Sequence, residues 1–271
     1  MSTMPPGRAV PLAVRFALRE LRGGLSGFYV FLACIALGTA AIGGVNAVST
    51  SVTRGIEEQG QVILGGDLRF ELNHRTATPE ERAFLDSLGT VAVSANMRSM
   101  ARLEDQSDQS LVELKAVDGN YPLYGELQTE PALDRDALYA ERDGRYGAAV
   151  QQILLDRLGI AVGDTIRLGN AVFEIRALIA SEPDAVSDGF AFAPRVLVSM
   201  DGLAASGLVQ PGSLVEYHYK IRDDAASPAD LQAIEDRAHD EFPAAGWSIR
   251  SRANAAPVRG WPSRSIRPGV P

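Results

Sequence analysis

The chain has 271 residues, 46% hydrophobic and 22% charged, which is typical of folded proteins and excludes a largely disordered one. Its net charge is −8, and no stretch after residue 54 gathers basic residues before the Arg-rich end, which excludes nucleic acid as a partner. The single cysteine, Cys34, excludes a disulfide and a cysteine-based metal site in the soluble part.

Residues 24–53 carry no charge and are predicted to be a transmembrane helix. Within them, Leu25–Val48 is apolar and long enough to cross a bilayer core, which takes about 20 residues. Four arginines precede this run, and Glu57 and Glu58 follow it. By the positive-inside rule, residues 1–23 form a cytoplasmic basic or interfacial segment, and the remaining chain lies outside.

Other interpretations of this region stay open. A cleaved secretory signal also begins with basic residues, although its apolar core spans roughly 7 to 15 residues. Val10–Arg22 suits a helix lying in the headgroup layer, or it forms the first turns of the spanning helix. Small residues at helical spacing, such as Thr39 and Gly43, indicate a neighbouring transmembrane helix.

Residues 54–256 are predicted to form an acidic outer domain. Its helices are expected from Thr78-Pro79, where a capping box begins, to Gly89, and over 131–140, 150–158 and 228–242. Its strands are expected over 67–72, 91–103, 111–117, 164–168, 171–180, 195–199, 213–222 and 247–250. Because hairpins and helices interleave without a regular βαβ repeat, the fold class is α+β with mostly antiparallel sheet.

The strand over 213–222 is strongly amphipathic. Its apolar face carries Val215, Tyr217, Tyr219 and Ile221, and its opposite face carries Glu216, His218, Lys220 and Arg222. Residues 257–271 lack apolar periodicity and are predicted to be an unstructured, aberrant tail.

No nucleotide-binding or nucleophile motif occurs, so we expect no catalytic and no cofactor-binding residues. His74, His218 and His239 are too scattered for a metal site and are expected in surface or capping roles. The acidic pairs Glu80-Glu81 and Asp223-Asp224 are interpreted as capping and loop residues. The aromatic loop Tyr121–Tyr124 is expected to pack a turn, with contact to a hydrophobic substrate as the alternative.

Five stretches in order resemble a known family: ALRELRGG, LGGDLRFEL, KAVDGNYPLYGEL, LLDRLGIAVGDTIRLGNAVFEIRALIASEPD and LVQPGSLVEYHY. Together they are similar to YbbP-type ABC transporter permeases of the FtsX/MacB superfamily. The matching glycines and loop residues are turn formers, which we interpret as shape-giving. They are Gly65, Gly66, Asp67, Asp118, Tyr121, Pro122, Leu123, Gly125, Gly163, Asp164 and Gly169.

The resemblance implies one N-terminal transmembrane helix followed by a MacB-like periplasmic mixed α/β domain, in a single-pass protein of the bacterial inner membrane. It implies a permease component that moves or extracts a lipid-like or amphiphilic substrate. The implied partners are a separate cytoplasmic ABC ATPase, other transmembrane helices of the permease and membrane lipid. Such permeases continue through further spans, so this chain is expected to be truncated. The alternative is a single-pass, membrane-anchored periplasmic binding or adaptor protein.

Overall fold

The computed structural model describes residues 31–40, 60–185 and 193–252, and the chain divides into two compact units, Met1–Gly55 and Ile56–Pro271. In the first unit, residues 31–40 are helical, and the Thr39 hydroxyl donates to the carbonyl of Ile35. Most of the predicted span, the predicted basic segment and the predicted tail lie outside the described residues. Among the described residues, no helix combines the length and apolar character needed to span a membrane.

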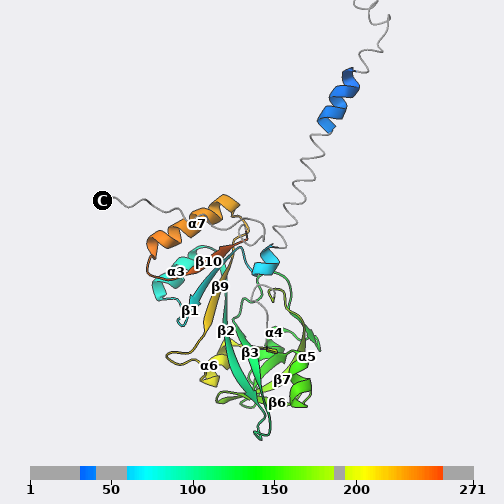
Figure 1. The fold of residues 1–271 in the computed structure, drawn as a ribbon, viewed down its shortest axis with the longest axis vertical. Coiled ribbons are helices and arrows are strands. Elements are labelled where there is room, and N and C mark those ends of the chain that lie inside the picture. The colour runs from blue at the N-terminus through cyan, green and yellow to red at the C-terminus, as the bar shows by residue number, and fades with distance from the viewer. Residues whose placement is uncertain (1–30, 41–59, 186–192, 253–271) are drawn as a thin grey trace, which may run out of the picture. The chain divides into compact units, whose positions relative to one another are not determined.

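The elements of the second unit are named in Figure 1. The strands are β1 (Leu68–Asn73), β2 (Thr90–Arg102), β3 (Gln109–Val117), β4 (Gln128–Glu130), β5 (Tyr146–Val150), β6 (Thr165–Leu168), β7 (Ala171–Ser181), β8 (Arg195–Ser199), β9 (Glu216–Arg222) and β10 (Ser248–Ser251). The helices are α3 (Pro79–Ser87), α4 (Arg135–Tyr139), α5 (Gln152–Leu158), α6 (Met200–Ser206) and α7 (Pro228–Glu241).

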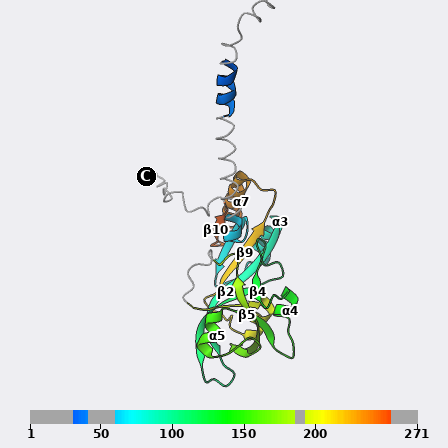
Figure 2. The same ribbon diagram turned by 90° about the vertical axis from the view of Figure 1, so that its right-hand side faces the viewer.

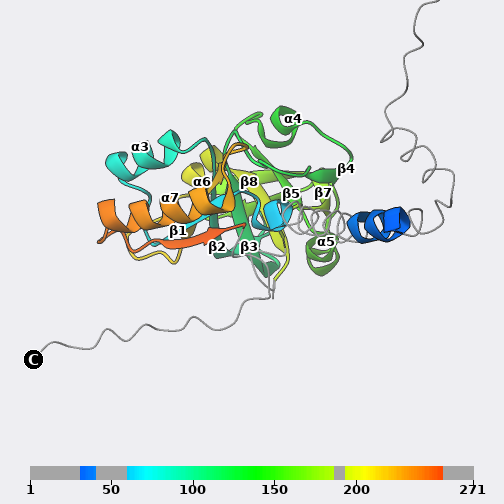
Figure 3. The ribbon, with the colours of Figure 1, turned by 90° about the horizontal axis from the view of Figure 1, so that it is seen from above.

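Four antiparallel strands in the order β10-β1-β9-β2 form a split βαβ sheet at one end of this unit. Helix α3 joins β1 to β2, and α7 joins β9 to β10. Both helices lie side by side over the sheet in Figure 3. The chain between β2 and β9, from β3 to α6, is an insert in this pattern.

The insert and the second half of β2 form a closed barrel. Pairing runs β2-β3-β8-β5-β7-β6, and β6 returns to β2 at Ala101 and Arg102. The β3–β8 and β5–β7 pairs are parallel, and the other strand pairs are antiparallel. Figure 2 shows the barrel strands and α5 at the end of the unit remote from α3 and α7. The long strand β2 therefore belongs to both the sheet and the barrel.

One hydrophobic core fills the barrel and continues beneath α3 and α7. Phe84 of α3 and Phe70 of β1 both pack on Trp247, with ring centroids 5.9 and 5.1 Å apart. Burial of such large aromatic side chains dominates core energetics. A smaller cluster lies on the other side of the sheet and includes Ala92, Val117 and Leu197.

The predicted fold class, mixed α and β with mostly antiparallel sheet, is confirmed, as are the expected strands and the capping box of α3. Three elements were missed: β4, β5 and α6. The helix predicted over 150–158 begins two residues later, because Val150 ends β5. Strand β5 reads Tyr-Gly-Ala-Ala-Val and is buried on both faces, so it lacks the alternation that marks a half-buried strand. The helix predicted over 131–140 is shorter in the structure, where α4 spans Arg135–Tyr139.

Candidate functional site

The sheet face opposite α3 and α7 is charged but buried. As predicted, the apolar residues of β9 enter the core. The surface role predicted for His218 is wrong, since His218 is 4% exposed and its neighbour Lys220 is 1% exposed. Alternation identifies the two faces of a strand but not what covers each one. His218 Nδ1 lies 3.0 Å from Asn96 Nδ2 on β2.

The other predicted polar roles are confirmed. His74 and His239 are exposed, and each ring lies near a backbone carbonyl. Glu81 closes the capping box of α3, and Asp224 pairs with Arg222 at the surface. In the part of the chain that the structure describes, no three His, Cys, Asp or Glu residues are grouped to hold a metal ion.

The chain has two lysines, and both meet in the interior. Lys115 Nζ of β3 lies 2.9 Å from each carboxylate oxygen of Asp184 and 2.6 Å from Glu182 Oε1. Lys220 of β9 pairs with the same Asp184 carboxylate. The Tyr121 hydroxyl donates to Asp184 Oδ1 at 2.6 Å, and its ring lies beneath Lys115 Nζ at 4.7 Å.

Arg195 of β8 extends this group. Its Nη1 lies 3.0 Å from Glu182 Oε1, and its Nη2 lies 3.6 Å from Glu113. We call Lys115, Tyr121, Glu182, Asp184, Arg195 and Lys220 the ion cluster. Buried charges are tolerated when they are paired, and removing one partner costs about 3 to 5 kcal/mol. The cluster therefore holds β3, β8, β9 and the segment after β7 in one arrangement.

A second buried carboxylate, Asp67, lies between Gln61 and Arg252, which are near the first and last described residues of the second unit. It is 0% exposed and precedes β1. Its oxygens accept hydrogen bonds from Gln61 Nε2 at 2.8 Å, Arg252 Nη1 at 2.5 Å, Tyr124 Oη at 2.7 Å and the Asp223 N–H at 2.8 Å. We call these five residues the junction. Burial, together with the Asp67 carboxylate, raises the pKa of Tyr124, so its hydroxyl remains a donor at neutral pH.

Glycines let the junction and the ion cluster approach closely. Gly65 has φ +72°, and a Cβ there would lie 3.1 Å from Lys220 Cδ and 3.2 Å from Asp184 Cβ. Gly125 has φ +73°, and a Cβ there would lie 2.7 Å from Pro183 Cβ. These contacts support the predicted shape-giving role of both glycines.

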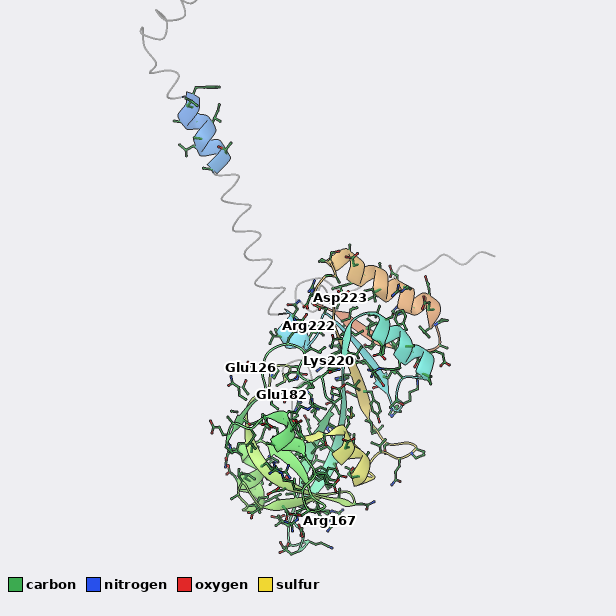
Figure 4. The ribbon with its side chains drawn as sticks, turned by 180° about the vertical axis from the view of Figure 1, so that it is seen from behind. Glu126, Arg167, Glu182, Lys220, Arg222 and Asp223 are labelled. Atoms are coloured by element: carbon green, nitrogen blue, oxygen red, sulfur yellow. The ribbon has the colours of Figure 1, made fainter. Side chains whose placement is uncertain are left out.

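Figure 4 labels Lys220 and Glu182 of the ion cluster and Asp223 of the junction. The labelled residues at the end of β9, Lys220 and Arg222, and Asp223 after it, lie in the same half of the unit as Glu182, which follows β7. Arg167 of β6 lies at the opposite end of the unit. The predicted turn at Tyr121–Tyr124 is therefore more than apolar packing, because both tyrosine hydroxyls bond to buried carboxylates.

A cleft of about 760 Å³ lies beside the ion cluster. Its lining includes Lys115 and Arg195 of the cluster, Arg98 of β2 and the loop residue Leu214, which is 77% exposed. The cleft thus brings charged side chains and an exposed leucine together.

Two solved structures resemble the chain, each at 10% sequence identity. The periplasmic region of MacB from Actinobacillus actinomycetemcomitans gives a TM-score of 0.44, covering 71% of this chain and 92% of that one. The extracellular domain of the ABC-type transporter YknZ from Gram-positive bacteria gives 0.45, covering 68% of this chain and 100% of that one.

A curated relative is the ABC transporter permease YbbP of Escherichia coli (strain K12), itself described as uncharacterized. It is 29% identical over 193 residues, which make up 69% of this chain and 22% of YbbP. The chain thus spans about a fifth of the length of that relative. The model of the MacB-like periplasmic core domain matches residues 30–240. The chain therefore belongs to the family of MacB-like periplasmic core domains, within the FtsX/MacB superfamily.

Proposed function

We propose that this chain is a component of an ABC transporter permease, held in the bacterial inner membrane by residues 24–53, with the domain from residue 54 to 256 in the periplasm. Residues 1–23 would lie in the cytoplasm. The similarity to YbbP and the charge difference across the apolar run support this topology. The substrate class is a lipid-like or amphiphilic molecule, and a separate cytoplasmic ATPase supplies the energy.

One observation carries the role of the outer domain. Gln61, which follows the predicted span, and Arg252, at the other end of the described domain, bond to the same buried carboxylate of Asp67. Permeases of this kind continue into further spans beyond the outer domain. In a permease that continues beyond Arg252 into a further span, both connections to the membrane would pass through the junction, so movement of the membrane helices would reach the outer domain there.

Affinity isolation of the tagged full chain from solubilised native membranes tests this function. We expect an ABC ATPase and further permease helices to co-purify, identified by mass spectrometry. Recovery from the membrane without an ATPase would contradict the permease role and favour the alternative of a single-pass periplasmic adaptor.

A substitution pair gives the control. Leu37→Arg places a charge within the predicted span, which costs about 3 kcal/mol on the insertion scale. We expect it to lower the membrane-bound fraction and the co-purified ATPase together. Leu214→Arg introduces the same charge at an exposed loop position of the outer domain and should leave both unchanged.

A further inference from the structure

The loop Asp118–Gly125 connects the two buried carboxylates. The Tyr121 hydroxyl donates to Asp184 of the ion cluster, and the Tyr124 hydroxyl, in the same loop, donates to Asp67 of the junction. The start of the loop is fixed to β2, because the Asp118 carboxylate accepts from the Val93 N–H at 2.8 Å. Its end is fixed as well, because Gly125 packs against Pro183.

We propose that Asp118–Gly125 is a coupling strap: it passes a change in the relative position of Gln61 and Arg252 at Asp67 to the ion cluster, and so to the barrel strands β3 and β8. This inference rests on the proposed function, and it applies to a permease in which the chain continues beyond Arg252 into a further span. It goes beyond that function by naming the path and the residues that respond.

The geometry makes the path stiff. Asp67 bonds to Gln61 from one end and Arg252 from the other, so separating these residues breaks at least one of its hydrogen bonds. Tyr124 shares the same carboxylate and shifts with it. Tyr121, three residues away in a loop held at both ends, then moves relative to Asp184 and Lys115. A displacement at the junction thereby loosens the pairing of the buried lysines.

A second path exists and must be separated from the strap. Gly65, which lies between Gln61 and Asp67 in the sequence, packs against Lys220 and Asp184, so this segment also touches the cluster without the loop. Tyr124→Phe removes the hydroxyl that joins the strap to Asp67 and keeps the ring, so it interrupts one path and leaves the other.

Acylation of the two lysines measures opening of the cluster. Lys115 and Lys220 are the only ε-amines of the chain and are each 1% exposed, so an amine-reactive ester modifies them when the cluster opens. Arg252 bonds to Asp67 and to the carbonyl of Ala226. In the full chain in detergent, Arg252→Gln should raise the acylation rate of Lys115 about fivefold, read by mass spectrometry.

Three variants decide the interpretation. Arg250→Gln removes the same charge at an exposed position of β10 and should change the rate less than twofold. Glu81→Gln destabilises α3 away from the junction, and an equal rise there would show general loosening and overturn the strap. In a Tyr124→Phe background, Arg252→Gln should add less than a twofold increase.

A wild-type acylation rate in Arg252→Gln, or an undiminished fivefold response in the Tyr124→Phe background, would also overturn the proposal. The assay needs neither an ATPase nor a transported substrate. A negative acylation result would therefore contradict the strap alone. The proposed permease function is tested separately, by the affinity isolation.

Discussion

Two buried carboxylates organise the polar interior of the second unit. Asp184 forms ion pairs with both lysines of the chain, and Asp67 forms an ion pair with Arg252. Each carboxylate also accepts a tyrosine hydroxyl from the same loop. Replacing such groups with apolar ones is often neutral for stability, whereas removing one partner is costly. We therefore assign these residues to fixing one arrangement of the strands, with the net stability supplied by the hydrophobic core.

The close approach at Gly125 can be tested by adding one methyl group. Gly125→Ala incurs about 1 to 2 kcal/mol for its left-handed backbone and about 1 to 3 kcal/mol more for the contact with Pro183. Gly144→Ala has nearly the same φ, +75°, and a Cβ there would meet nothing within 4 Å. Thermal unfolding should show Gly125→Ala melting several degrees below Gly144→Ala. Equal melting temperatures would show that the Pro183 contact yields without cost.

At this scale the sequence predicts turn residues better than buried charges. Gly65 and Gly125 could be identified as shape-giving, because their backbone requirement is local. Lys115 and Lys220 could not be placed in the interior, because their carboxylate partners lie far away in the chain. One usable signal was composition: in a chain with 26 basic residues, lysine occurs twice, each time between apolar residues of a strand.

Helix starts in this protein are specified by short sequence patterns. Thr78 caps α3 and Ser227 caps α7, each followed by proline and each completing a capping box with an acidic residue at the third helical position. In α3 the acidic residue, Glu81, also accepts two hydrogen bonds from Arg75, at 2.6 and 2.7 Å. This pairing ties the loop after β1 to the helix that covers the sheet.

The pairing predicts a defined pH dependence. The hydrogen bonds from Arg75 lower the pKa of Glu81, so the stability that Glu81 contributes is complete above its unfolded pKa, about 4.3, and is lost as pH falls through the folded value. Glu81→Gln should cost about 1.5 to 3 kcal/mol at pH 7. The difference from wild type should shrink below about pH 4.

Melting temperatures between pH 3 and pH 7 check this prediction. Glu80→Gln, at the exposed neighbouring position, is the matched control and should stay close to wild type throughout. A Glu81→Gln deficit that is the same at pH 3 and pH 7 would contradict a role for the charged carboxylate.

Elements with clear local signals were predicted, and those defined by their surroundings were missed. The hairpin of β6 and β7 was readable because Gly169-Asn170 can take a tight turn. Strand β5 was not, because it has no polar face, and β4 has three residues, too few for any periodicity. Helix α6 reads Met-Asp-Gly-Leu-Ala-Ala-Ser, and its internal glycine disfavours a helix.

The described part of the second unit is a split βαβ sheet with a barrel inserted between two of its strands. The barrel closes because β6 pairs both with the next strand, β7, and with the distant strand β2. In the second pair, Arg102 of β2 lies opposite Arg167 of β6. Such closure depends on long-range pairing that no local pattern specifies. The fold class was therefore predictable, whereas the barrel, the buried polar face and the meeting of Gln61 and Arg252 at Asp67 required the structure.

The central claim is that this unit lies outside the membrane while the first residues stay inside. Ala132→Cys in a Cys34→Ala background places a single thiol on an exposed loop of the outer unit, and Thr3→Cys in the same background places one in the predicted cytoplasmic segment. In cells with an intact inner membrane, a membrane-impermeant maleimide should label Ala132→Cys at once and Thr3→Cys after the membrane is opened. Protection of both thiols until lysis, or recovery of the chain in the soluble fraction, would contradict the account.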